Sequence, residues 1–367
     1  MGFTCVRRLV VVIAVIAATS GCERRQPVVI GLTYAAGDTY ASVLSGARTT
    51  SRDSARTDVP TIVDATGVQF EPGAAGQVKL ASHFAAYPGI LAVVGHSDSR
   101  STLAAAPVYA EAHIPLLVPT STSRLLRSVS PWVFMMAPDD SVEAEFIAAF
   151  VAETLRARTA TIFYDNDEYG IGLRDGLRQS LAARHVGLTA EEPIGSFCMA
   201  GQEQADASLV RAMPRANPPG VVIIAGRTQL AACIGRRVHD RLATTPIIGG
   251  DAVEPDSLFF ATAGPAASHF YRVAFWHPSV PGAASVAFAQ GYQAVTGQPP
   301  HASNAMLFDA VSLVMYAARE VGSDREAIRG YLAELGRSRP PYAGVTGAVA
   351  FGGAPRPLYM LRVGAAP

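Results

Sequence analysis

The chain has 367 residues, 49% of them hydrophobic, and its 30 lysine and arginine side chains are balanced by 30 aspartates and glutamates. This neutrality argues against nucleic acid as a partner, because binding to phosphates needs an excess of basic side chains. The length exceeds what a single hydrophobic core usually holds, so two lobes are expected.

Residues 1–21 have the features of a lipoprotein signal peptide. Arg7 and Arg8 give a basic start, an apolar run follows, and small residues lead to Cys22. The run is too short for a comfortable transmembrane helix. Small residues ending in Gly-Cys resemble a bacterial lipobox, which implies a lipid anchor on Cys22, a linker over residues 22–26 and an extracytoplasmic domain tethered to the membrane. Ordinary secretion, with an incidental thiol at this position, is the alternative.

Strands and helices alternate in the next part of the chain. Apolar strands are expected over residues 27–33 and 61–64, and apolar spacing predicts a helix over residues 76–87. Residues 93–122 then have the pattern of strand, polar turn, helix, strand and polar turn in one unbroken unit. A right-handed crossover places both turns at the same edge of a parallel sheet, which is where open α/β sheets bind ligands.

Both turns are rich in hydroxyl groups. Beside the N–H groups of a helix N-terminus, such a cradle suits a carboxylate. A single serine or threonine often only caps a helix, but two such turns meeting at one edge predict a ligand site. The hydroxyl residues are Ser97, Ser99, Ser101 and Thr102 in the first turn and Thr120, Ser121 and Thr122 in the second.

A second alternation begins after residues 138–140, where the chain is expected to cross between lobes. A long helix is predicted from residue 142 to about residue 156. Further helices are predicted around residues 173–184, 207–213 and 229–237, and strands over 159–164, near 188, over 220–225 and over 245–248. The aromatic residues 269–276 are expected to cross back, before helices around 284–296, 304–321 and 325–335. The tail is predicted as a hairpin of residues 344–351 and 358–363.

These elements predict an α/β fold of two doubly wound parallel-sheet lobes joined by a multi-stranded hinge. Residues 27–140 and 277–335 are assigned to the first lobe, and residues 141–276 and 336–367 to the second. The ligand-binding edges of the two sheets would face each other across a cleft, the usual place for a small-molecule site.

Two cysteines lie beyond the signal and anchor, Cys198 and Cys233. In an oxidising compartment they could form a disulfide, although two buried free thiols fit the sequence nearly as well. No cysteine or histidine spacing supports a metal site, and no cofactor is expected.

Several segments follow one another in a recognisable order: VVGHSDSRSTLAAAPVYAEAHIPLLVPTST, FMMAPDDSVEAE, TIFYDNDEYGIGL, IIGGDAV, and SNAMLFDAVSLVMYAARE with GVTGAVAF. Together they resemble the substrate-binding proteins of branched-chain amino acid ABC transporters, the leucine/isoleucine/valine-binding type with the type I periplasmic binding fold. The resemblance implies a non-catalytic receptor that captures a small amino acid or similar polar ligand and delivers it to ABC permease subunits. A ligand-sensing or regulatory protein on the same fold is the alternative.

The resemblance also implies roles for individual residues. Ser99 would hold the α-carboxylate of the ligand, Thr120 would supply a backbone group, and Thr122, next to Ser121, would touch both carboxylate and ammonium. Asp251 would bind the ammonium group. An amino acid needs these two kinds of partner, because one of its ends is an anion and the other a cation.

Three further positions belong to the expected cleft. By the same resemblance, Asp140 and Tyr169 would line or close it. Arg227 departs from the family, which often has an aromatic or small residue there. This arginine could pair with an acidic or polar part of the ligand or with Asp251, although solvent or a partner within its own lobe fits better.

Two motifs point elsewhere and are set aside. Gly170, Gly172 and Gly176 follow a strand and open a helix, but their spacing departs from the dinucleotide fingerprint, and three acidic residues just before them would repel a pyrophosphate. Close turn geometry and helix packing explain these glycines better. His96 lies near Ser99, yet residues so close in sequence rarely form the relay that acyl transfer needs, so no catalytic residue is expected.

Overall fold

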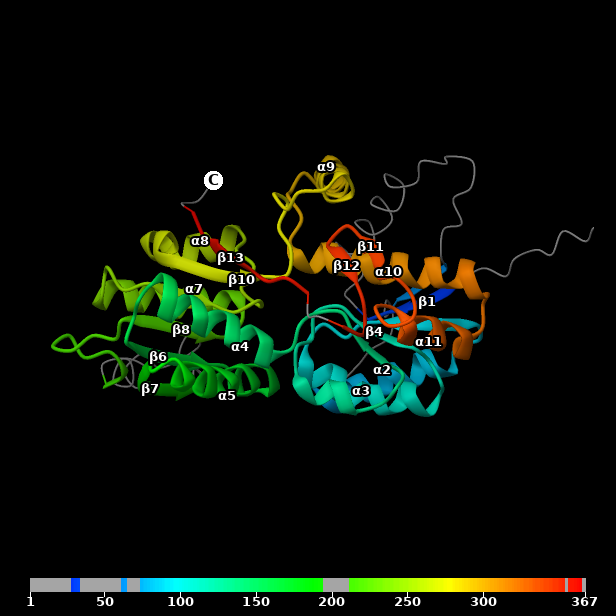
Figure 1. Cartoon of the computed structure of the whole chain (residues 1–367), viewed down its shortest axis with the longest axis horizontal. Helices are drawn as coiled ribbons and strands as arrows, with labels where there is room; N and C mark the ends of the chain where they lie inside the picture. The colour runs from blue at the N-terminus through cyan, green and yellow to red at the C-terminus, as the bar shows by residue number, and fades with distance from the viewer. Residues whose placement is uncertain (1–27, 34–60, 65–72, 194–210, 354–355, 365–367) are drawn as a thin grey trace, which may run out of the picture.

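The computed structural model describes residues 28–33, 61–64, 73–193, 211–353 and 356–364. Two α/β lobes lie side by side (Figure 1). The predicted fold of two largely parallel sheets is therefore confirmed. The signal segment, Cys22 and Cys198 lie outside the described residues.

The first lobe contains a five-stranded parallel sheet in the order β2-β1-β3-β4-β5. Its β3 strand is buried along its whole length, as expected for a parallel sheet covered on both faces. The strands are β1 (Val29–Leu32), β2 (Thr61–Asp64), β3 (Ile90–Val94), β4 (Leu116–Val118) and β5 (Val133–Met135).

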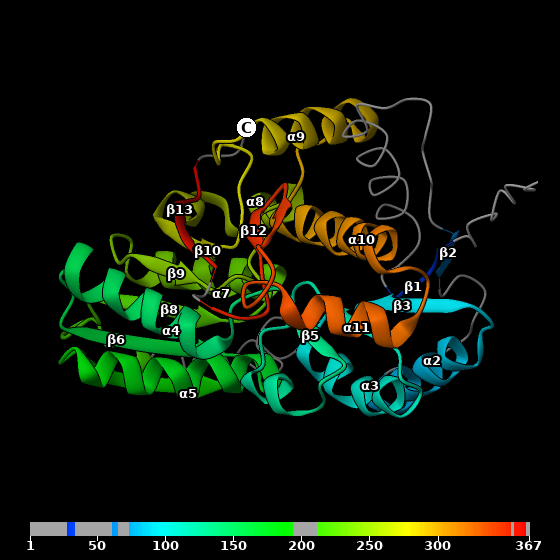
Figure 2. The ribbon, with the colours of Figure 1, turned by 45° about the vertical axis from the view of Figure 1, so that its right-hand side comes forward.

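Helices cover both faces of this first sheet. One face packs against α2 (Ala74–Ala86) and α3 (Ser99–Glu111), and the other against α10 (Ala302–Val321) and α11 (Arg325–Glu334). A short 3-10 helix, η1 (Arg124–Ser128), precedes β5. The chain thus returns to the first lobe after it has built the second (Figure 2).

The second lobe has a six-stranded sheet in the order β13-β10-β9-β8-β6-β7, in which only β13 runs antiparallel. One face packs against α4, η2 and α5, and the other against α7, α8 and η3. The strands are β6 (Thr159–Tyr164), β7 (Gly187–Pro193), β8 (Val221–Ala225), β9 (Ile247–Gly249), β10 (Phe270–Ala274) and β13 (Tyr359–Arg362). The helices are α4 (Asp140–Ala149), η2 (Phe150–Thr154), α5 (Glu168–Ala183), α7 (Thr228–Arg241), α8 (Ser257–Ala263) and η3 (Gly264–His269).

The tail differs from its prediction. The hairpin pairs β11 (Tyr342–Gly344) with β12 (Gly347–Val349), and it packs on the first lobe beside α10. Only β13 joins the second sheet, where it pairs with β10. Residues 336–353 are therefore not part of the second lobe, because their apolar side chains are buried in the core of the first.

The crossing predicted for residues 269–276 is also shorter than expected. Phe270–Ala274 is a strand inside the second sheet, and the chain leaves that lobe only afterwards, toward α9 (Ala283–Thr296). Trp276 and Phe288 then pack together against the start of α10, with ring centroids 5.7 Å apart. The chain passes between the lobes at β5–α4, at β10–α9 and between β12 and β13.

Candidate functional site

The two hydroxyl-rich turns of the first lobe meet at one edge of its sheet. The Thr102 and Ser121 hydroxyl oxygens lie 2.7 Å apart, and the Ser123 backbone N–H donates to the Ser99 hydroxyl at 3.3 Å. This follows from the adjacency of β3 and β4 in the sheet. The predicted meeting of the two turns is confirmed.

Asp98, rather than a hydroxyl, caps helix α3. Its carboxylate accepts from the backbone N–H of Ser101 at 2.9 Å and from the Ser101 hydroxyl at 2.7 Å. An aspartate at this position satisfies N–H groups of the first turn that have no partner within the helix. The hydroxyls of the turn are therefore not needed as the cap.

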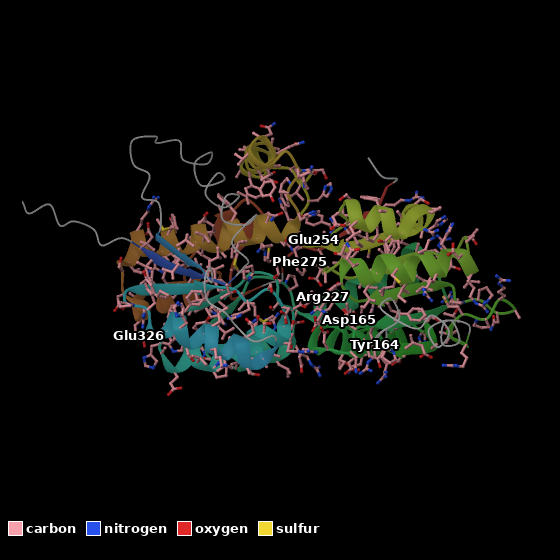
Figure 3. All side chains as sticks on the ribbon, turned by 180° about the vertical axis from the view of Figure 1, so that it is seen from behind. Tyr164, Asp165, Arg227, Glu254, Phe275 and Glu326 are labelled. Carbon is pink, nitrogen blue, oxygen red and sulfur yellow. The ribbon has the colours of Figure 1, made fainter. Side chains whose placement is uncertain are left out.

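A cavity of about 940 Å³ lies between the two lobes. The two hydroxyl-rich turns of the first lobe contribute Ser97 and Thr120 to its lining. The second lobe contributes Arg227, Asp251 and much of the apolar lining. Figure 3 labels four lining residues where the lobes meet: Asp165, Arg227, Glu254 and Phe275. The predicted arrangement of sheet edges around one cleft matches this geometry.

The predicted site residues fall into two groups. Thr120, Arg227 and Asp251 line the cavity. The other five are buried side chains, none more than 4% exposed, and do not line it: Ser99, Ser121, Thr122, Asp140 and Tyr169.

Arg227 pairs within its own lobe. Its Nη1 atom lies 3.1 Å from an oxygen of Asp165 and 2.6 Å from one of Asp167, and its guanidinium lies 5.9 Å from the centre of the Tyr169 ring. Both carboxylates follow β6, whereas Asp251 follows β9, so the arginine neutralises a different part of the wall. The sequence favoured solvent or a partner within the same lobe over Asp251, and the observed partners are Asp165 and Asp167.

Asp251 belongs to a buried group of carboxyl residues with Glu143 and Asp140. The Asp251 backbone N–H donates to Oε1 of Glu143 at 2.8 Å, and the Ala252 N–H donates to the Tyr169 hydroxyl at 3.4 Å. Several oxygens of this group are buried without a well-formed hydrogen bond: Oδ1 of Asp251, Oε2 of Glu143 and both carboxylate oxygens of Asp140. We refer to these three residues as the acidic group.

Burial shifts the titration of the acidic group. It raises the pKa of Asp140 to about 7, with the Asp251 charge adding to the effect and the Thr122 hydroxyl opposing it. It raises the pKa of Asp251 to about 6 against interactions with Glu143 and Tyr169, and that of Glu143 well above its ordinary value. Oxygens that lack donors in a water-poor place favour a cation or N–H groups from a ligand.

Glycines allow the close approach of these elements. A Cβ on Gly172 would lie 2.4 Å from Oδ2 of Asp140, and one on Gly250 would lie 2.4 Å from the Tyr169 hydroxyl. A Cβ on Gly170 would lie 2.2 Å from the backbone oxygen of Asp165. Helix packing and a tight turn, as predicted, account for the glycines at the start of α5.

Sequence reasoning missed Glu143 and Glu254. Glu143 follows Asp140 by three residues, so both project from the same face of a helix, and that spacing is visible in the sequence. Glu254 accepts from the Ser303 N–H at 2.9 Å and from its hydroxyl at 2.6 Å, which links the loop after β9 to the start of α10. No local sequence pattern predicts this contact between Glu254 and Ser303, which are 49 positions apart.

Cys233 and His96 were also considered in the sequence as possible functional residues. Cys233 lines the cavity and is disulfide-bonded, while Cys198, its predicted partner, lies outside the described residues. The His96 ring contacts Gln77 at 2.7 Å and the Tyr109 hydroxyl at 3.1 Å. Burial lowers the pKa of His96 to about 4, so the ring is neutral at physiological pH.

Across the described ranges, no cluster of three or more histidine, cysteine, aspartate or glutamate side chains has a geometry that could hold a metal ion. Within the same ranges, none of the helices combines the length and the apolar composition needed to span a bilayer.

Comparison with known proteins identifies relatives along much of the chain. A family model described as periplasmic binding protein matches residues 73–366. An amino acid binding protein of Pseudomonas aeruginosa is 29% identical over 177 residues, which are 48% of this chain and 46% of that protein. The Leu/Ile/Val-binding protein BraC3 of Rhizobium johnstonii is 28% identical over 166 residues, 45% of this chain and 44% of its own length. The matched stretch spans a little under half the length of each of these relatives.

Solved structures resemble the whole fold. LivJ of Streptococcus pneumoniae, in complex with isoleucine, has a TM-score of 0.76 at 23% identity and covers 91% of this chain and 95% of its own. A solute binding protein of an ABC transporter from R. palustris, in complex with benzoate, has a TM-score of 0.74 at 17% identity, with coverages of 92% and 93%. At such identities the likeness shows the fold.

Proposed function

The chain belongs to the periplasmic binding protein family, and from that premise we propose that it is a non-catalytic extracytoplasmic receptor for a small amino acid or similar polar ligand. The ligand would bind between the lobes, close them, and be delivered to an ABC permease. Closure follows because a ligand that touches both lobes binds the closed state more tightly than the open one.

The proposal rests on one observation: hydroxyl-bearing residues of one lobe and an acidic residue of the other line the same cavity. Hydroxyl and backbone groups of the first lobe, at Ser97 and Thr120, share the cavity with the carboxyl group of Asp251 from the second. An amino acid zwitterion is complementary to both, with its carboxylate toward the hydroxyls and its ammonium toward Asp251. Ser99 and Thr122, next to Ser121, would complete the carboxylate end, with Thr122 also touching the ammonium, and Asp140 and Tyr169 would line or close the cleft.

The ligand class follows from the acidic group. Among the structural relatives, one is described with isoleucine and another with benzoate, which has no ammonium group. Buried carboxyl oxygens without donors suit an ammonium and disfavour a ligand that is only an anion. We therefore place this chain with receptors for amino acids.

The surroundings of His96 and Ser99 support a binding role. The His96 ring is held by Gln77 and Tyr109 and does not contact the Ser99 hydroxyl, which accepts instead from the Ser123 backbone. A relay for acyl transfer needs the base within hydrogen-bond reach of the nucleophile.

Attachment to the membrane is a separate part of the proposal. The sequence before Cys22 supports cleavage and lipidation there, which would tether the receptor on the outer side of the membrane. Replacing this residue, as Cys22→Ser, should then release the protein from the membrane fraction.

A calorimetric titration with a panel of amino acids tests the binding role. We expect at least one amino acid to bind, and Asp251→Asn to weaken that binding by about 10- to 100-fold, since a charge-assisted hydrogen bond contributes about 1.5–3 kcal/mol. Asp240→Asn serves as a control on the same lobe, because its carboxylate is 62% exposed, pairs with Arg236 and does not line the cavity. Binding of benzoate with no binding of any amino acid would contradict the assignment.

A further inference from the structure

Glu143 is a buried carboxyl group that contacts the proposed ammonium site from behind. It is fully buried on α4, and its Oε1 accepts the backbone N–H of Asp251 at 2.8 Å. Its other oxygen, Oε2, and the Asp251 oxygen Oδ1 are both buried without a donor. The hydrogen bond therefore keeps two carboxyl groups close together where little water can separate their charges.

Two ionised carboxylates in such a place would repel each other strongly. A single proton on one of them removes the repulsion and supplies the missing donor. Glu143 is the better holder of that proton, because it is enclosed on all sides while Asp251 lines the cavity. The ionised partner is then the one that faces the ligand.

We propose that Glu143 is a positioning residue of the ligand site, which retains its proton and donates it in a hydrogen bond to the Asp251 carboxylate. The acidic pair then presents one negative charge, matched to one ammonium group. This inference rests on the proposed function, in which Asp251 receives the ammonium of the ligand.

The groups around the pair come from four elements. Asp140 lies on α4 with Glu143, Tyr169 on α5, and Glu254 on the loop after β9. Arg272 on β10 is 7% exposed. The negative charges of Glu254 and Asp251 oppose the lowering of its pKa by burial. The two carboxyl neighbours of the pair, Asp140 and Glu254, outnumber this arginine, which favours a neutral Glu143.

The titration directions agree with this arrangement. Burial, followed by repulsion from Asp251, raises the pKa of Glu143 well above its ordinary value, whereas that of Asp251 rises to about 6. Both directions favour the proton on Glu143 and the charge on Asp251. Below about pH 6 Asp251 becomes protonated as well, and the affinity for an ammonium ligand should fall.

The matched variant Glu143→Gln tests the inference. A glutamine keeps an oxygen for the Asp251 N–H and offers an N–H to its carboxylate, as the protonated acid does. We expect the Kd for L-leucine at pH 7 to stay within about threefold of the original, while Glu143→Ala, which leaves both groups without a partner, raises it about tenfold or more. If Glu143→Gln instead weakens binding as much as Asp251→Asn, the charge on Glu143 binds the ligand and the inference is wrong.

A measurement without ligand separates this inference from the proposed function. Infrared difference spectra of the protein at pH 7, with and without Glu143→Gln, should show the carbonyl band of a protonated carboxylic acid that only the original chain has. A carboxylate band in its place would overturn the inference, whatever the ligand. If the spectra show the acid but L-leucine and the rest of the amino acid panel do not bind, the proposed function fails and the proton assignment stands.

Discussion

Burial of Asp140 has a large expected effect on stability. Its side chain is 1% exposed, and both of its oxygens lack a well-formed hydrogen bond. Because folding raises its pKa from 3.8 to about 7, the ionised form is less stable in the folded protein than in the unfolded chain. The cost is absent below about pH 4, grows as the pH rises, and is complete above about pH 7.

Asp140→Asn should therefore stabilise the ligand-free protein at pH 8 by on the order of 2–4 kcal/mol and have little effect at pH 4.5. Urea unfolding at the two pH values measures the difference. The conservative change keeps the size of the side chain and removes only its charge. An equal effect at both pH values would show that folding does not raise the pKa of this aspartate.

Glu143 illustrates which single residues of the site could be predicted from the sequence and which could not. The segment that contains it was singled out, and Asp140 and Asp251 were predicted as site residues. Glu143 and Asp251 are separated by 108 positions in the chain, and their contact depends on how α4 packs against the end of β9. A contact of that kind is set by packing and has no local signature.

At the scale of helices and strands, the packing of α4 against α5 depends on small residues. A Cβ on Gly176 would lie 2.8 Å from the Cβ of Ala144 and 3.2 Å from the backbone oxygen of Asp140. Neither neighbour can move without moving α4. These helices therefore approach each other more closely than any larger residue at this position would permit.

Gly176→Ala should destabilise the fold by about 1–3 kcal/mol, although alanine favours helices, because the extra methyl forces the two helices apart. Gly330→Ala on α11 is the matched control: its added Cβ would meet no atom within 4 Å, and a gain of up to about 1 kcal/mol is expected. Thermal unfolding of both variants measures the contrast. Equal effects at the two positions would contradict the packing argument.

The alternation of strands and helices was sufficient to predict two parallel sheets, but neither β5 and β10 as members of them nor the tail was predicted from it. The predicted hairpin of residues 344–351 and 358–363 would turn at the glycines 352 and 353, whereas the actual turn contains Val345 and Thr346. Their N–H groups donate to the buried carboxylate of Asp309 on α10, at 2.7 and 2.9 Å. This long-range anchor fixes where the hairpin turns, and glycine content alone pointed to the wrong place.

Closure of the lobes is the motion expected of the whole molecule. The cavity between them is lined from both sides, and the chain passes between the lobes in three places. Several connections restrict the lobes to a bending motion about the hinge, so that a ligand in the cavity draws them together.

Small-angle X-ray scattering should therefore give a smaller radius of gyration with a bound amino acid than without it. The Asp251→Asn variant at the same ligand concentration is the control, because its cleft should remain largely unoccupied. Identical scattering curves, in the presence of binding detected by calorimetry, would show that capture does not close the lobes.

The last strand of the chain also determines when the molecule can fold during its synthesis. A ribosome that has reached the start of α10 (Ala302–Val321) has made every other strand of both large sheets, but β13 (Tyr359–Arg362) is still missing from beside β10, and the first sheet lacks the helices that cover one of its faces. Domains usually fold from the N-terminus as they emerge. Here neither lobe has its full set of elements until synthesis is almost finished, so the complete fold can form only after nearly the whole chain has been made.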